Sequence, residues 1–230
     1  KDAAELAAMR RAVAVAEAAF AATLERIQAG MTEQQLAAEL MVQTLNAGSG
    51  ALPFAPIVAA GANGANPHAG AGDRPLQPGD VVTIDWGATV DGYAADLTRC
   101  VVVAGAAPDP RLVAAYEAVR AANAAGRAAA RPGGTGQDVD RAARQVIAAA
   151  GLGDFFIHRT GHGLGLEGHE EPDMNEGSLT PLAPGMTFTV EPGVYIPGVG
   201  GVRLEDDVVI TSDGAETLST LSRELLVVGG

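Results

Sequence analysis

The chain has 230 residues with a formal net charge of −13 and a sequence pI of about 4.6. This acidic balance argues against binding to nucleic-acid phosphates or to an anionic membrane as the main activity. An apolar fraction of 47% allows a large core, so we expect residues 1–230 to form one domain. No apolar run is long enough for a membrane span, and the single cysteine, Cys100, fits a reducing compartment, which we take to be the cytoplasm.

Four helices are predicted from the helical spacing of apolar residues and from the signals at their ends. The first is dense in alanine and stops at Gly30, and Thr32 with Gln35 forms a capping box for the second. Pro110 suits the first turn of the third helix, and Gly151 closes the fourth. The expected helices cover residues 2–29, 32–45, 110–130 and 137–150.

The remaining segments alternate as strands do or are interrupted by Gly and Pro. Residues 51–80 read as loops and strands and carry His68, whereas residues 155–174 hold three histidines among many glycines and are too broken for a helix. The expected strands lie in residues 83–101, 186–191, 202–210 and 224–228.

The stretch of residues 83–101 reads as a hairpin, in which Asp91-Gly92 suits a two-residue turn with positive φ. With that turn, opposite residues sum to 183, so Asp85 faces Thr98. Asp96 is then the diagonal neighbour of Asp85 on the same face, roughly 7–8 Å away. Two carboxylates that face each other in an apolar sheet need a cation or a shared proton between them. A solvated hairpin face explains this stretch equally well when it is taken alone.

The two halves of the chain repeat the same order of elements and punctuation. Leu76-Gln77-Pro78-Gly79 is echoed by Leu182-Ala183-Pro184-Gly185, an offset of 106 residues. Seven residues after each proline stands an acid, and another follows in the next strand; the pairs are Asp85 with Asp96 and Glu191 with Glu205. We therefore predict a pseudo-twofold α+β domain of helix-helix-strand-strand halves, with curved antiparallel strands inside, helices outside and the acids meeting at the axis.

Four carboxylates and at least one histidine that converge in a sheet interior make a site for two metal ions. Oxygen-rich ligation favours Mn²⁺ or Co²⁺ over a thiolate-type zinc centre. Two ions roughly 3.5–4 Å apart activate a water and hold the oxyanion of a tetrahedral intermediate. The chemistry that fits is hydrolysis of an amide bond.

Other catalytic motifs fail on inspection. The pair His158 and His162 has the spacing of helical zinc ligands, but glycines interrupt it and no glutamate follows His158. The glycines around His162 lack the lysine of a phosphate-binding loop. No serine or cysteine lies in a strand-turn-helix nucleophile context.

Four segments resemble the creatinase and Xaa-Pro peptidase family of pita-bread metallopeptidases, in its Xaa-Pro aminopeptidase and prolidase branch. They are NPHAG (66–70), TIDWGATVDGYAADLTR (83–99), HRTGHGLGLEGHEEP (158–172) and TVEPGVYIPGVGGVRLEDD (189–207). The resemblance implies the pita-bread fold and hydrolysis of the Xaa-Pro bond at the N-terminus of peptides or in dipeptides. It also implies two divalent ions, with Mn²⁺ expected and Co²⁺ or Zn²⁺ as alternatives, a homodimer, and an N-terminal domain upstream of this one.

The resemblance also assigns metal ligands residue by residue. Asp85 would chelate one ion, Asp96 and Glu205 would bridge both, and His162 and Glu191 would complete the other. Glu191 would also act as the base for the attacking water.

The resemblance gives roles to four further residues. His68 would lie near the substrate amine and the leaving group, and His169 would hydrogen-bond the scissile carbonyl or its oxyanion. His158 would line the pocket that receives proline. Arg203, two residues before Glu205, would hydrogen-bond the bridging acids and tune them.

Two other functions remain open from the residues. One is creatinase-like hydrolysis or other small-molecule chemistry on the same fold, and the other is an inactive binding module. Arg203 and His158 point away from methionine aminopeptidases. The expected partner is a small peptide with proline at its second position, and the residues do not choose between dipeptidase and aminopeptidase action.

Overall fold

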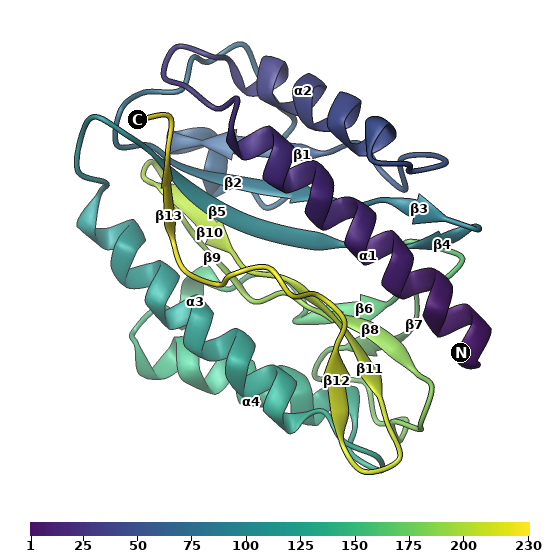
Figure 1. Ribbon diagram of the computed structural model, residues 1–230. Coiled ribbons are helices and arrows are strands. Elements are labelled where there is room, and N and C mark those ends of the chain that lie inside the picture. Colours follow the sequence, from purple (N-terminus) through teal and green to yellow (C-terminus); the bar gives the residue numbers. More distant parts are fainter.

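The computed structural model describes residues 1–230 and places helices outside and strands between them (Figure 1). The helix pair α1 and α2 lies on one side of the strands, and the pair α3 and α4 lies on the other (Figure 1). The α-helices are α1 (Ala3–Leu24), α2 (Glu33–Asn46), α3 (Pro110–Ala129) and α4 (Gly136–Ala149), and two short 3₁₀ helices are η1 (Gly61–Ala65) and η2 (Gly153–Phe155). The mixed α+β architecture agrees with the prediction. None of these helices combines the length and the apolar character that crossing a bilayer requires.

Capping side chains fix where the helices begin. Thr32 accepts the N–H of Gln35, whose side chain accepts the N–H of Thr32, which is the predicted capping box of α2. Helix α1 stops at Leu24, earlier than predicted. Beyond it Ile27 turns into the core and is 2% exposed, and Gly30 adopts a φ of +88°. The chain therefore uses residues 25–30 to turn into α2 instead of extending α1.

Two larger sheets and two short hairpins contain the strands. The sheet orders are β1-β2-β5-β13 and β12-β11-β8-β6-β7, and β9 pairs with β10 and β3 with β4. The strands are β1 (Ile57–Ala60), β2 (Val81–Trp86), β3 (Thr89–Val90), β4 (Tyr93–Ala94), β5 (Leu97–Val103), β6 (Gly161–Gly163), β7 (Glu170–Met174), β8 (Thr187–Val190), β9 (Gly193–Ile196), β10 (Gly200–Arg203), β11 (Asp206–Ile210), β12 (Ala215–Thr217) and β13 (Leu226–Val228). All pairs are antiparallel except β13 with β5, which is parallel.

The predicted hairpin register is confirmed. Asp85 of β2 lies opposite Thr98 of β5, and the β3–β4 pair continues with the same sum of 183. Asp91 and Gly92 have φ values of 52° and 84°, which a two-residue turn between twisted strands requires. The hairpin therefore brings Asp85 and Asp96 to one face of the sheet.

The predicted strand of residues 202–210 is two strands, β10 and β11, which belong to different sheets. The chain breaks at Leu204-Glu205 because it leaves its hairpin partner β9 and joins β8. Glu205 forms an isolated bridge with Thr98 of the first half. The break places this acid at the junction of the two halves. Strands β6, β7, β9 and β12 were not anticipated from the sequence.

The internal repeat is confirmed in three dimensions. Thr32, the cap of α2, bridges Pro75, and Thr135, the cap of α4, bridges Pro181, which keeps the offset of 106 residues between the two prolines. Core side chains of α1 and α2 pack on β2 and β5, and those of α3 and α4 pack on β9 and β10. Each half thus carries its own helix pair, and the strands of both halves meet between them.

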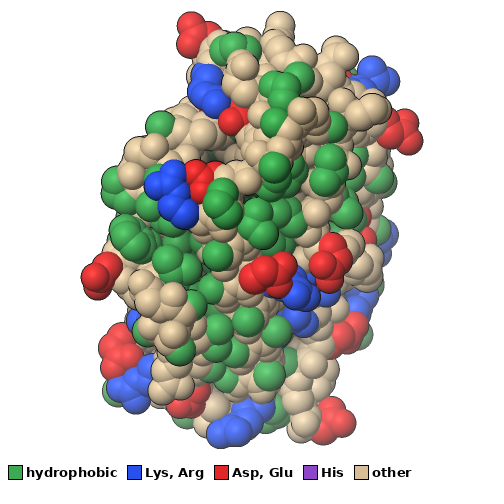
Figure 2. Space-filling view, turned by 90° about the vertical axis from the view of Figure 1, so that its left-hand side faces the viewer, with side chains coloured by type: hydrophobic (Ala, Val, Ile, Leu, Met, Phe, Trp, Pro, Cys, Tyr) green, Lys and Arg blue, Asp and Glu red, His purple; other side chains and the backbone are tan.

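The surface agrees with the acidic balance of the chain. On the face drawn in Figure 2, Lys and Arg side chains lie singly or beside acidic groups and form no basic stripe. Hydrophobic side chains are spread among them (Figure 2). This face therefore offers no continuous positive potential to a phosphate backbone.

Candidate metal centre

Four acids reach one point from the ends of four strands. Asp85 lies near the end of β2 and Asp96 just before β5, while Glu191 follows β8 and Glu205 precedes β11. One carboxylate oxygen each of Asp85, Asp96 and Glu205 lies within 4.8 Å of the others, and a ligand atom each of His162, Glu191 and Glu205 does likewise. The two groups share Glu205. The repeat thus supplies two neighbouring sets of oxygen-rich ligands.

All nine residues singled out from the sequence line one cavity of about 590 Å³. They are His68, Asp85, Asp96, His158, His162, His169, Glu191, Arg203 and Glu205. Sequence reasoning missed the apolar part of the wall, which includes Pro53, Phe54 and Ile57, and also missed Arg159. Pro53-Phe54 precedes β1 in a loop whose approach to the acids no local pattern reveals.

Burial acts to raise the pKa of all four acids, and neighbouring charges make the outcome differ among them. It raises the pKa of Asp85, and together with the charge of Glu205 it raises the pKa of Asp96 well above the ordinary value. Burial and then the charge of Glu191 raise the pKa of Glu205 in the same way. Burial also acts to raise the pKa of Glu191, but nearby positive charge, that of His162 first, outweighs it and leaves this pKa lowered. Without a counter-charge the cluster therefore holds protons.

One oxygen of Asp85 indicates where positive charge belongs. Its Oδ2 accepts a hydrogen bond from Arg203, whereas Oδ1 is buried and has no hydrogen-bond partner. An unpaired buried polar atom costs about 1–3 kcal/mol, and more when it is charged. The orphaned oxygen and the oxygen-rich surroundings fit a divalent cation.

His162 turns one ring nitrogen toward the acids. Its Nε2 lies 3.3 Å from Oε1 of Glu191 and 3.6 Å from Oδ2 of Asp96. Its Nδ1 lies 3.0 Å from the carbonyl oxygen of Gly163, so Nδ1 donates its proton to this oxygen while Nε2 faces the acids. This arrangement suits a histidine ligand whose orientation is fixed from behind.

The other three histidines surround this centre at different depths. The ring centre of His169 lies 3.9 Å from that of His162, and burial lowers its pKa. A nitrogen of His169 also falls within 4.8 Å of ligand atoms of Asp96 and His162. His158 is bonded through Nε2 to the hydroxyl of Tyr195 at 2.9 Å, and burial lowers its pKa. His68 is exposed on the loop between η1 and β2.

Arg203 has a different partner from the expected one. Its guanidinium donates to Asp85 and, through Nε at 3.1 Å, to Oγ1 of Thr98. Thr98 in turn donates to Oε2 of Glu205 at 2.6 Å. Arg203 therefore reaches Glu205 only through a hydroxyl, because β10 ends beside β2 and Thr98 stands between the two side chains.

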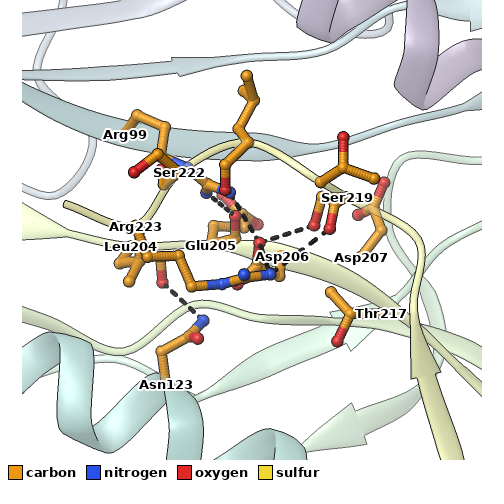
Figure 3. A network of polar contacts seen from close by, with 12 residues as sticks. Arg99, Asn123, Leu204, Glu205, Asp206, Asp207, Thr217, Ser219, Ser222 and Arg223 are labelled. Carbon is orange, nitrogen blue, oxygen red and sulfur yellow. Dashed lines mark hydrogen bonds and ion pairs between the residues drawn. The ribbon is translucent and has the colours of Figure 1, made fainter.

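A buried ionic network holds the backbone of Glu205 from behind (Figure 3). Arg99 donates to the carbonyl oxygen of Glu205 at 2.6 Å and to Oδ1 of Asp206 at 2.9 Å. Asp206, which is fully buried, also accepts from Arg223 and Ser219, each at 2.7 Å. Burial acts to raise the pKa of Asp206, but the charges of Arg99 and Arg223 lower it overall. Sequence reasoning missed this network.

Asp207 supports the first half in a similar way. It accepts the N–H of Asp96 at 3.2 Å through Oδ2, and burial raises its pKa well above the ordinary value. The run Glu205-Asp206-Asp207 was the sequence signal that could have predicted these buried partners. Three consecutive acids inside an apolar strand each need a separate partner.

Comparisons with known proteins agree with this arrangement. Residues 7–212 of the chain match the sequence pattern of metallopeptidase family M24. The chain is 42% identical to the probable dipeptidase PepE of Mycobacterium bovis over 99% of its length and 60% of that protein, and 40% identical to the Xaa-Pro dipeptidase of Pyrococcus furiosus over 96% and 63%. The crystal structure of X-Pro aminopeptidase from Thermotoga maritima superposes with a TM-score of 0.96 at 40% identity, over 99% of this chain and 64% of that one. The chain thus spans less than two thirds of these relatives.

Proposed function

The chain belongs to metallopeptidase family M24, and from that premise we propose that it hydrolyses the peptide bond that precedes proline, at the N-terminus of peptides or in dipeptides. The relatives named Xaa-Pro dipeptidase and X-Pro aminopeptidase support this substrate class. The observation that carries the proposal is the convergence of four acids and four histidines on one cavity. In this proposal residues 1–230 act as one catalytic domain.

The proposed centre takes two divalent ions, with Mn²⁺ expected and Co²⁺ or Zn²⁺ as alternatives. The residues that would hold the ions are Asp85, Asp96, His162, Glu191 and Glu205, and the resemblance would assign Asp96 and Glu205 to both ions. The orphaned oxygen of Asp85 supports a cation on its free side. When bound, such ions lower the pKa of a water and polarise the scissile carbonyl.

The chain's own groups then move protons and position the substrate. Glu191, the one acid of the cluster whose pKa is lowered, accepts the proton of the attacking water. His169 donates a hydrogen bond to the oxygen of the scissile carbonyl as negative charge develops on it. His68 lies near the substrate amine and the leaving group. Arg203 fixes the carboxylate of Asp85, and Tyr195 fixes the ring of His158.

The apolar side of the cavity suits a cyclic, apolar residue, such as proline, after the scissile bond. Pro53, Phe54 and Ile57 form its apolar side, and His158 lies in the same cavity. A proline ring that packs against these side chains is removed from water, which is favourable. Its nitrogen carries no N–H, so the wall needs no hydrogen-bond acceptor for it.

Activity with defined peptides tests the proposal. The protein is incubated with Mn²⁺ and an Xaa-Pro dipeptide, and separately with a longer Xaa-Pro peptide, and the release of the N-terminal residue is measured. Cleavage of one or both is expected, and the ratio of their kcat/KM values separates dipeptidase from aminopeptidase action. If neither is cleaved while the metals are bound, small-molecule chemistry of the creatinase type replaces the proposal.

Two further parts of the proposal concern the setting of the enzyme. We expect a homodimer, which light scattering on the purified protein checks directly. We also expect a reducing compartment, the cytoplasm, in keeping with one buried free cysteine, Cys100.

A further inference from the structure

Glu33 is a fully buried carboxylate that the centre does not use. It occupies the first position of α2 and is 0% exposed. Oε1 accepts the backbone N–H of Ala60 at 2.8 Å, and Oε2 accepts from the side chain of Asn63 at 2.7 Å and from the backbone N–H of Gly72 at 2.9 Å. The start of a helix favours a negative charge. Three donors and the helix terminus therefore hold this acid.

The three donors enclose the loop that carries His68. Ala60 precedes the loop, Gly72 follows it, and Asn63 also donates to the carbonyl oxygen of Gly70 at 3.2 Å. Within residues 61–71 only two small residues are buried, Gly64 and Ala69. The methyl group of Ala69 is the only fully buried apolar side chain of the loop, so apolar packing contributes little and polar contacts largely determine its path.

The opposite side of the loop lies against the candidate metal centre. The carbonyl oxygen of Pro67 accepts a hydrogen bond from Arg203 at 3.2 Å, and Pro67 and His68 both line the cavity. Gly64 packs backbone to backbone on β10, where a Cβ added at Gly201 would lie 2.1 Å from the oxygen of Gly64. The loop is thus held between α2 on one side and β10 on the other.

We propose that Glu33 is a positioning residue whose carboxylate closes both ends of the loop of residues 61–71 and thereby places His68 in the substrate cavity. This inference rests on the proposed function, because it takes the substrate contact of His68 from it. The position requires an acid. A glutamine of the same size has one oxygen for three donors, and its amide nitrogen would face a donor at a position that is 0% exposed to solvent.

A double-mutant cycle tests the placement of His68. Glu33→Gln is expected to lower kcat/KM for an Xaa-Pro dipeptide about 10-fold, with metal content unchanged, because a loosened loop misplaces the histidine. In a His68→Ala background the same change is expected to have little further effect. Glu39→Gln is the matched control. It makes the same substitution on the same helix, where Glu39 pairs with Arg26 outside the cavity, and is expected to leave both kcat/KM and metal content unaltered.

Equal losses from Glu33→Gln in the wild-type and His68→Ala backgrounds would overturn the proposal, because the acid would then act independently of His68. Hydrogen exchange gives a readout that needs no activity. The amides of residues 60–72 are expected to exchange faster in Glu33→Gln than in Glu39→Gln, and equal exchange would also overturn it. If the wild type cleaves no Xaa-Pro peptide but exchange in this loop responds, the proposed substrate is wrong and the loop closure by Glu33 stands.

Discussion

The carboxyl groups of Asp85, Asp96 and Glu205 define the chemistry of the molecule at the scale of single residues. Each is at least nine-tenths buried, and each has a pKa raised first of all by burial. A folded-state pKa above the unfolded value means that the folded protein binds protons more tightly than the unfolded chain. Proton binding therefore stabilises the fold at low pH, and this contribution is lost as pH rises through the raised pKa. In the proposed centre a divalent cation would replace those protons, so proton and metal would compete for the same oxygens.

Metal-free Asp96→Asn should become more stable relative to metal-free wild type as pH rises from 5 to 8. The wild type must ionise a desolvated carboxyl group over this range, whereas the amide has nothing to ionise. With Mn²⁺ the wild type should be the more stable of the two, because only it retains the carboxylate ligand. Thermal unfolding of chelator-treated and Mn²⁺-loaded samples at several pH values measures both. A difference between the two metal-free proteins that is independent of pH would contradict the raised pKa of Asp96.

His169→Ala should keep its metal ions and lose turnover by roughly 10²-fold, because this histidine is expected to donate to the developing oxyanion. The position of its ring beside His162 makes the result informative, since a nitrogen of His169 also lies within 4.8 Å of ligand atoms of Asp96. Metal analysis together with kcat/KM distinguishes the two roles. Loss of an ion in this variant would make His169 a ligand instead.

At the scale of elements, short sequence patterns predicted the turns and helix ends that neighbouring residues determine. The turn Asp91-Gly92 set the hairpin register. The capping threonine of α2, the proline at the start of α3 and the glycine after α4 marked these helices to within a few residues. The acid at the same distance from each Pro-Gly turn predicted that Asp85 and Glu191 share the site. Each of these signals lies within a few residues of the feature that it predicts.

The features that were missed depend on distant parts of the chain. The break at Glu205 arises because β10 and β11 join different sheets, and the bridge from Glu205 to Thr98 crosses between the halves. The parallel pairing of β13 with β5 likewise follows from where the last segment returns. The sequence next to Arg99 does not reveal its role, because the acceptors that join it to the centre, Glu205 and Asp206, lie more than a hundred residues away.

Thr135→Ala should destabilise the protein by about 1 kcal/mol without loss of metal, because Thr135 caps α4 by accepting the N–H of Asp138 at 3.2 Å. Thr180→Ala, at an exposed residue, serves as the control and should change stability much less. Denaturant unfolding at constant metal concentration measures the difference. Equal stability of the two variants would show that packing of α3 on α4 fixes the start of the helix without the cap.

At the scale of the whole molecule, the duplication explains why the centre has two parts. The first half supplies Asp85 and Asp96, the second supplies His162, Glu191 and Glu205, and the bridge between Thr98 and Glu205 joins them. Each half brings a helix pair that covers its strands from outside (Figure 1). The cavity therefore forms only when both halves are folded together. We predict from this that metal binding and global folding are coupled.

Metal content per chain tests this account most directly. After equilibration with Mn²⁺ and removal of free ions, elemental analysis should find two ions per chain in the wild type and in the control Asp154→Ala, whose acid is exposed. Asp96→Ala should hold fewer than one, because the proposed bridging ligand serves both ions. A wild type that binds no Mn²⁺, Co²⁺ or Zn²⁺, or an Asp96→Ala protein that still holds two ions, would contradict a shared centre built from both halves.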